Sequence, residues 1–203
     1  MYKRLDPFFY QRTDVVELSK ELLGKVLVTE FDGSTTAGMI VETEAYRAPD
    51  DKACHAHLNR YTERTKVMFA EGGLAYVYLC YGIHHLFNVV TGQKGMAHAI
   101  LIRAIEPLEG IEQMLERRGF EQLKPQLTAG PGVMSKALGI HKSMTGSSLV
   151  DPASSMYIED RGITIPPEEI IASPRVGIDY AEECAEWPWR FRIRNNRWTS
   201  KAK

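Results

Sequence analysis

The pattern of apolar and polar positions predicts a β-strand that ends at Tyr46. Apolar residues run from Met39 to Val41, and the chain then alternates between acids and smaller residues through Glu42 and Glu44. Residues two apart in a strand share a face, so we expect Glu42, Glu44 and Tyr46 to point the same way. Two carboxylates and a ring fit a pocket that activates water beside a flat ligand. They also fit the acidic solvent face of an edge strand, and this stretch alone favours that second interpretation.

Similar patterns predict further elements along the chain. Strands are predicted over 25–31, 74–80, 86–90, 98–105, 156–159, 170–172 and 191–194, and helices over 15–23, 62–69, 107–118 and 131–138. Asp32 and Gly33 predict a turn that joins the first of these strands to the strand ending at Tyr46. Consecutive strands lie too close in sequence for helical crossovers, which favours antiparallel pairing. We therefore predict an α+β fold, a single compact domain over residues 1–203 with a curved, mostly antiparallel sheet surrounded by α-helices.

One charge interrupts an otherwise apolar strand. The segment 98–105 is continuously apolar apart from Arg103, so that side chain is expected to be buried. A buried arginine needs a carboxylate or phosphate partner, because an unpaired charge is costly to remove from water.

Composition places the chain among ordinary globular proteins. Its 203 residues are 44% hydrophobic and 25% charged, enough for one well-filled core. Three widely spaced cysteines argue against a disulfide framework. No apolar run is long enough to cross a bilayer, and the first residues lack the apolar segment of a signal peptide. We expect a protein that is not secreted and not in a membrane, cytoplasmic in a bacterium or nuclear in a eukaryote.

Charge is segregated although the formal net charge is only −1. The chain carries no acid after Trp187, and its basic tail consists of Arg190, Arg192, Arg194, Arg197, Lys201 and Lys203. A second basic cluster consists of Arg60, Arg64 and Lys66. Such clusters can attract a polyanion to one face, although a solvated tail and a solvated helix face explain them equally well.

Several kinds of active site are disfavoured by spacing. The candidate metal ligands Cys54, His55, His57, His84 and His85 do not have the spacing of a zinc motif. No serine lies in a GxSxG motif, and no glycine-rich stretch ends in the GKS of a phosphate loop. We therefore expect neither a metal nor a cofactor.

A carboxylate that activates water beside aromatic rings is the remaining candidate. The cavity would be lined by Glu44, Tyr46, His55, Tyr76, Tyr78 and Tyr81. Facing π surfaces bind a planar base, and a cationic base better still. Periodicity alone equally describes these tyrosines as the core and rim of a sheet.

Three sequence segments, in this order along the chain, resemble those of a known family. They are IVETEAY at 40–46, LAYVYLCYG at 74–82 and LIRAIEP at 101–107. Together they resemble the 3-methyladenine (alkyladenine, alkylpurine) DNA glycosylase family, of the mammalian alkyladenine glycosylase type. The resemblance extends from about Asp14 to the end of the chain. One departure is Val133, where relatives commonly carry lysine.

The resemblance implies an enzyme of base excision DNA repair. It would flip alkylated purines out of duplex DNA, with deaminated or etheno purines as further candidates, and hydrolyse the N-glycosidic bond with a glutamate-activated water. It would be monofunctional, with no lyase step. Its partner would be double-stranded DNA containing damaged purines, and it would act as a monomer without a cofactor.

The resemblance also implies catalytic and DNA-contacting roles. Glu44 matches the general base, Arg103 the arginine that holds the carboxylate and its water, and Tyr81 the residue intercalated into DNA. The base-binding pocket would be formed by Tyr46, His55, Tyr78 and Asn88. Candidate contacts to the DNA backbone are Thr62, Arg64, Met68 and Tyr76.

Three alternatives from other classes stay open at this point. A non-catalytic damaged-DNA-binding protein would use the same fold with an idle carboxylate. A metal-dependent hydrolase would use His55 and His57. A nucleoside N-glycosidase would act on free nucleosides, which the basic tail and Tyr81 disfavour.

Overall fold

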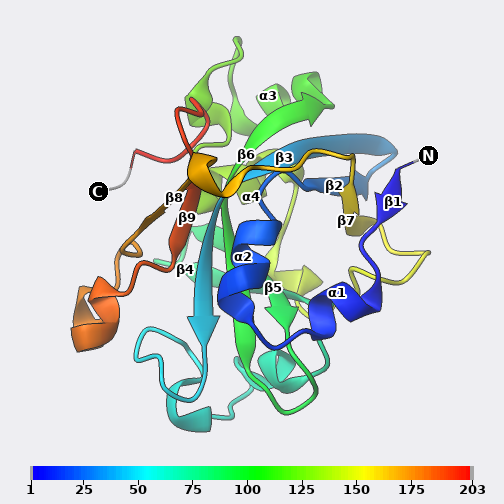
Figure 1. The fold of residues 1–203 in the computed structure, drawn as a ribbon. Helices are drawn as coiled ribbons and strands as arrows, with labels where there is room; N and C mark the ends of the chain where they lie inside the picture. The colour runs from blue at the N-terminus through cyan, green and yellow to red at the C-terminus, as the bar shows by residue number, and fades with distance from the viewer. Residues whose placement is uncertain (1, 202–203) are drawn as a thin grey trace.

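Two long antiparallel strands form the centre of the structure, a computed structural model that describes residues 2–201. Strand β3 (Ser34–Arg47) pairs with β6 (His98–Glu109) along almost its whole length. Both run through the middle of the molecule (Figure 1). The predicted strands ending at Tyr46 and covering 98–105 therefore become one continuous ladder.

The other strands extend this pair in both directions. Their bounds are β1 (Lys3–Arg4), β2 (Val26–Phe31), β4 (Ala75–Cys80), β5 (His84–Thr91), β7 (Met156–Asp160), β8 (Ile170–Ser173) and β9 (Arg190–Ile193). The main order is β1-β7-β2-β3-β6-β5-β4, while β9 pairs with β3 and β8. Each strand pair of the described chain is antiparallel. The predicted α+β class, antiparallel sheet and β2–β3 hairpin are confirmed.

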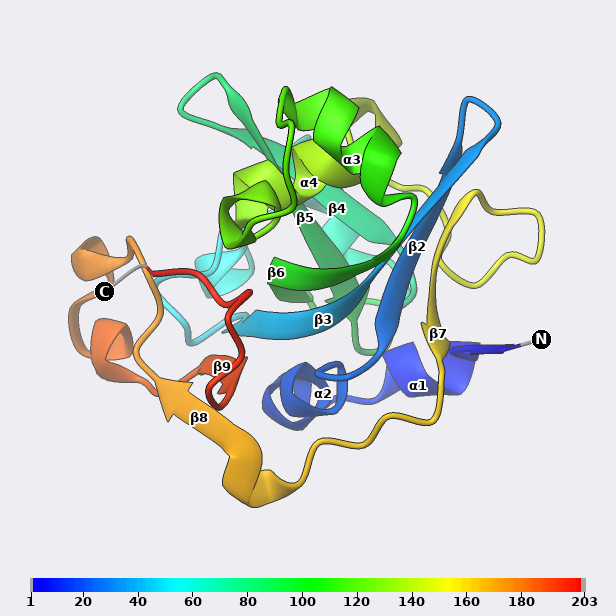
Figure 2. The same ribbon diagram turned by 90° about the horizontal axis from the view of Figure 1, so that it is seen from above.

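Short helices cover both faces of the sheet. The α-helices are α1 (Pro7–Gln11), α2 (Val15–Glu21), α3 (Ile111–Arg118) and α4 (Pro131–Leu138). The 3-10 helices are η1 (His57–Asn59), η2 (Lys66–Phe69), η3 (Pro125–Leu127), η4 (Lys142–Met144), η5 (Pro167–Glu169) and η6 (Asp179–Glu186). Figure 2 shows α1 and α2 on one side of β3 and β6, and α3 and α4 on the other. The Asp14 carboxylate caps α2 by accepting hydrogen bonds from the backbone N–H groups of Val16 and Glu17.

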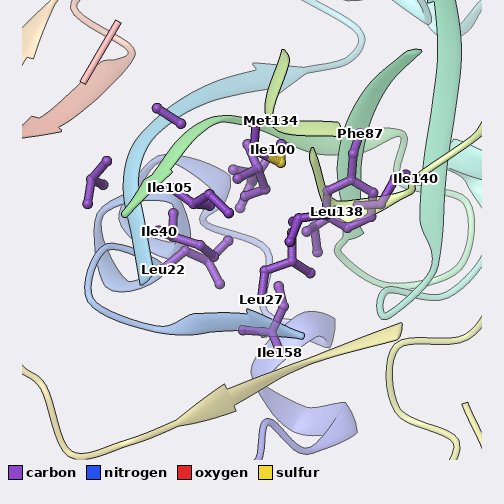
Figure 3. Close-up of a cluster of buried hydrophobic side chains, with 14 of the residues drawn as sticks. Leu22, Leu27, Ile40, Phe87, Ile100, Ile105, Met134, Leu138, Ile140 and Ile158 are labelled. Carbon is purple, nitrogen blue, oxygen red and sulfur yellow. The ribbon is translucent and has the colours of Figure 1, made fainter. Parts of the chain in front are cut away.

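The main core lies between these helices and the sheet. Leu22 after α2, Ile40 of β3, Ile105 of β6 and Met134 and Leu138 of α4 are all fully buried. Figure 3 shows these side chains converging from the different elements. Each such side chain contributes about 1.5–3 kcal/mol when removed from water. This packing gives the strands that carry the candidate site a rigid support.

Strand β3 changes partner halfway along its length. Residues 34–39 pair with β2, whereas Glu42, Thr43 and Glu44 pair with β9. The β3–β6 register shifts next to Glu42, so the strand is irregular where it passes from one partner to the other. Both carboxylates consequently lie in the interior, between β6 and β9, and the edge-strand interpretation is wrong.

Two predicted helix boundaries are also wrong. Pro107 does not begin a helix but lies in β6 opposite Gly38, next to a register shift. Proline lacks an N–H, and an irregular position of a sheet tolerates that loss. Helix α3 begins only at Ile111, after Gly110. The helix predicted over 62–69 is reduced to the 3-10 helix η2.

The helices of the described chain are all too short or too polar to span a membrane.

Candidate active site

A cavity of about 520 Å³ lies between the C-terminal end of β3, the β4–β5 hairpin and the loop before η6. Its lining includes many residues singled out from the sequence: Glu44, Tyr46, His55, Arg64, Met68, Tyr76, Tyr78, Tyr81, Asn88 and Arg103. These residues come from β3, β4, β5 and β6, from the turn between β4 and β5, and from the segment between β3 and β4 that includes η2. The antiparallel sheet brings them together although they are far apart in sequence.

Glu44 is the acid that borders this cavity. Its side chain is 0% exposed to bulk solvent. Oε1 accepts a hydrogen bond from the Val176 backbone N–H at 2.8 Å and lies 3.2 Å from Arg103 Nη1. Oε2 accepts one from the Tyr46 hydroxyl at 2.8 Å. A carboxylate has about four acceptor positions, so one position on Oε2 is left for a water molecule.

Glu42 has a structural environment instead. It is buried outside the cavity lining and accepts hydrogen bonds from Arg103 Nε, Arg190 Nε and the Ser200 hydroxyl at 2.8–2.9 Å. Burial acts to raise the pKa of this carboxyl, but Arg103, the Ser200 N–H and Arg190 outweigh it and hold the pKa below its ordinary value. Arg103 thus has the carboxylate partners that its burial requires, and it bridges Glu42 to Glu44.

Aromatic side chains form the walls of the cavity. The His55 ring packs edge-on against Tyr78, with ring centroids 4.7 Å apart. The Tyr46 ring lies under the Arg175 guanidinium, 4.7 Å from its centroid. Burial, and next the Glu44 charge, raise the pKa of the Tyr46 phenol well above its ordinary value. Its hydroxyl therefore stays protonated and donates to Glu44.

Hydrogen bonds connect His55 to two neighbours. His55 Nδ1 lies 2.8 Å from the Tyr76 hydroxyl, and Nε2 lies 3.1 Å from Arg64 Nη2. Arg64 Nε also donates to the Tyr76 oxygen at 3.3 Å. Burial first, and then the Arg64 charge, lower the pKa of His55 to about 4. His55 is thus a neutral wall of the cavity at physiological pH.

The amide of Asn88 is fixed by the backbone around it. Its nitrogen donates to the carbonyl oxygens of Tyr76 and Leu86 at 3.0 and 3.2 Å. The amide oxygen is the atom left for the cavity, which Asn88 borders.

Tyr81 stands at the tip of the β4–β5 hairpin, whose loop projects from the body of the molecule in Figure 2. Its side chain is 91% exposed, and its φ of 50° lies in the left-handed region. Leu79 and Ile83 beside it are also exposed. Exposed apolar side chains grouped next to an aromatic cavity are typical of a surface that contacts another molecule.

Two of the four proposed DNA-backbone contacts do not fit the structure. Thr62 and Arg64 lie at least partly at the surface. The side chains of Met68 and Tyr76 are only 1% and 2% exposed, and both line the cavity. A buried side chain does not reach a phosphate on the molecular surface, so these two belong to the cavity wall.

The basic tail is only partly available to a polyanion. Arg190 is buried and binds Glu42, so it forms part of the protein interior. Arg194, Arg197 and Lys201 are exposed. Lys203 lies outside the described residues.

Sequence reasoning missed the loop that closes the cavity. Arg175 is buried and binds the Asp51 carboxylate with Nη1 and Nη2, at 2.5 and 2.8 Å. This pair holds the loop whose Val176 N–H reaches Glu44, and Tyr180 borders the cavity from the same segment. Arg175 and Asp51 are far apart in sequence, so no motif spacing predicts that they pair. The sequence shows only that the two residues have opposite charges.

The candidate metal ligands do not converge. Within residues 2–201 there is no group of three or more histidine, cysteine, aspartate and glutamate side chains able to hold a metal ion.

Comparison with known proteins agrees with this geometry. Residues 8–197 match the methylpurine-DNA glycosylase family. Among similar proteins, each named "Putative 3-methyladenine DNA glycosylase", one from Chlamydia felis is 49% identical over 90% of this chain and 92% of its own. Others come from Bacillus cytotoxicus (46%, covering 96% and 98%) and Clostridium perfringens (42%, covering 98% and 99%). The chain belongs to the methylpurine-DNA glycosylase family.

Proposed function

We propose that this DNA glycosylase takes a damaged purine nucleotide out of duplex DNA into the aromatic cavity and hydrolyses its N-glycosidic bond. The observation that carries the proposal is the position of Glu44. It is a carboxylate with one open acceptor position, bordering a cavity lined by rings. The names of the relatives point to 3-methyladenine as one substrate base.

The carboxylate would act as general base. Water bound to Glu44 Oε2 loses its proton to the carboxylate as its oxygen bonds to the anomeric carbon of the sugar. The negative charge of Glu44 also offsets the positive charge that develops on the sugar as the base departs. Arg103 holds the Glu44 carboxylate in place, and the same arginine is shared with Glu42, which also binds Arg190.

The cavity walls would select the base. The rings of Tyr46, His55 and Tyr78 offer flat surfaces on which a purine stacks. Unstacking the nucleotide from the duplex costs on the order of a few kcal/mol, least for a damaged or mismatched base. Tyr81 would fill the vacated space in the duplex and recover part of that cost.

We expect the reaction to stop at the abasic site. Strand cleavage through a Schiff base needs an amine nucleophile, and no described lysine lines the cavity. We also propose that the protein acts as a monomer, because the cavity is formed by one chain.

Single-turnover base release from duplexes that differ only in the damaged purine tests this function. The panel contains 3-methyladenine, 7-methylguanine, hypoxanthine and ethenoadenine, with an undamaged duplex and excess chelator as controls. We expect release of at least one damaged base, unaffected by chelator, with strands left intact until alkali is added. Specific binding of a damaged duplex without release of any base would instead favour the non-catalytic damaged-DNA-binding protein.

A further inference from the structure

The hydrogen bonds around Tyr76 fix the direction of each proton. Arginine only donates, so His55 Nε2 accepts from Arg64 Nη2. A neutral His55 then carries its proton on Nδ1, and that N–H donates to the Tyr76 oxygen at 2.8 Å. Arg64 therefore selects one of the two neutral tautomers of His55.

The Tyr76 oxygen is left with a free proton. It accepts one hydrogen bond from His55 Nδ1 and a second, at 3.3 Å, from Arg64 Nε. A phenol oxygen has two acceptor positions, so both are occupied. No described residue accepts a hydrogen bond from the Tyr76 O–H, and the side chain borders the cavity. A donor with no protein acceptor beside a cavity is available to a ligand.

We propose that the Tyr76 hydroxyl donates a hydrogen bond to the purine held in the cavity, and that Arg64 and His55 are positioning residues that aim it. The inference rests on the proposed function and names the donor that assists departure of a neutral base. The phenolic proton stays on Tyr76 throughout. Burial raises the pKa of this phenol, which keeps it protonated across the physiological range.

The consequence is selectivity between two classes of purine. A neutral purine leaves with the electron pair of the glycosidic bond and becomes anionic, so a hydrogen bond to the ring stabilises it. A purine alkylated at N3 or N7 carries a positive charge and leaves as a neutral molecule. A hydrogen-bond donor therefore accelerates its departure only slightly. The Tyr76 hydroxyl therefore matters for hypoxanthine and much less for 7-methylguanine.

Tyr76→Phe tests this selectivity with almost no change in shape. Single-turnover release is measured on two duplexes of one sequence, with hypoxanthine or 7-methylguanine at the same position. We expect about a tenfold loss for hypoxanthine, as for one lost hydrogen bond, and less than about a twofold change for 7-methylguanine. Equal losses on both duplexes, or no loss on either, overturn the proposal. Wild-type protein that releases neither base contradicts the proposed function instead.

The positioning role of Arg64 can be tested by spectroscopy. If Arg64 had a purely structural role, its removal would not change the tautomer of His55. Nitrogen-15 chemical shifts of the imidazole ring, assigned with His55→Gln, report which nitrogen carries the proton. We expect the proton on Nδ1 in the wild type and a shift toward Nε2 in Arg64→Met. Arg60→Met removes an exposed arginine of the same segment that has no bond to His55, and should leave the tautomer unchanged. A wild-type ring protonated at Nε2 would refute the assignment.

Discussion

The hydroxyl of Tyr46 donates a hydrogen bond to Glu44 Oε2 at 2.8 Å, so one residue is both a wall of the cavity and a support of its carboxylate. The two residues are neighbours on one face of β3, as the spacing of two in a strand requires. Oε1 is held from the other side by Val176 and Arg103. Both carboxylate oxygens are thereby fixed relative to any base that stacks on the Tyr46 ring.

Tyr46→Phe should separate these two roles. The ring stays for stacking, while the Glu44 carboxylate loses one charge-assisted hydrogen bond, which is worth about 1.5–3 kcal/mol. We expect the single-turnover rate of base release to fall about tenfold with little change in affinity for damaged duplex. Tyr157→Phe is the matched control, because it removes a tyrosine–glutamate hydrogen bond of the same length, to Glu30, outside the cavity. Equal effects of the two variants would contradict this role of Tyr46.

Glu42→Gln should destabilise the fold strongly. The substitution leaves Arg103 and Arg190 buried without the carboxylate that both bind. Removing one partner of a buried ion pair costs about 3–5 kcal/mol, whereas an exposed pair is worth about 0–1 kcal/mol. Denaturant unfolding measures the difference, with Glu21→Gln, which breaks the exposed Arg12–Glu21 pair, as control. If Glu42→Gln lowers the free energy of unfolding no more than the control does, this ion pair does not stabilise the fold.

These residues also show which parts of the fold and site the sequence predicts. Alternation along the strand places Glu42 and Glu44 on one face, and the apolar context of Arg103 predicts a buried carboxylate partner. The pairing of Arg175 with Asp51 has no counterpart in local pattern, because it depends on how a distant loop folds back over the sheet. A proline that begins a helix and a proline beside a register shift look alike in sequence, so the sequence alone does not place Pro107 in β6.

His55 should titrate far below the ordinary histidine value of 6.5, with a midpoint near pH 4. Between these values the unfolded chain binds a proton that the folded protein excludes. The contribution of neutral His55 to stability is therefore complete above about pH 6.5, and it decreases as the pH falls toward 4. Proton NMR of the His55 ring measures the midpoint, and unfolding of His55→Gln against pH measures the linkage. A midpoint near 6.5 would show that the ring is solvated rather than part of a dry wall.

Tyr81→Ala should weaken binding to damaged DNA without weakening the fold. The side chain is almost fully exposed, and substitutions at such positions usually change stability by less than about 0.5 kcal/mol. We expect affinity for a damaged duplex to fall toward that for an undamaged duplex, since the gap left by the flipped base is no longer filled. Fluorescence anisotropy with both duplexes gives the ratio of the two affinities, and thermal unfolding checks the fold. An unchanged affinity ratio would show that Tyr81 does not fill the gap left by the flipped base.

Single-turnover base release by Glu44→Gln, at saturating enzyme on a duplex containing hypoxanthine or 7-methylguanine, tests the general base most directly. Glutamine keeps the size of the side chain but cannot take a proton from water, so we predict a loss of at least about a hundredfold. Binding of the damaged duplex should persist, and Glu30→Gln on β2 should keep the wild-type rate. A Glu44→Gln rate within a few-fold of wild type would contradict the account, because water would then need no base at this position.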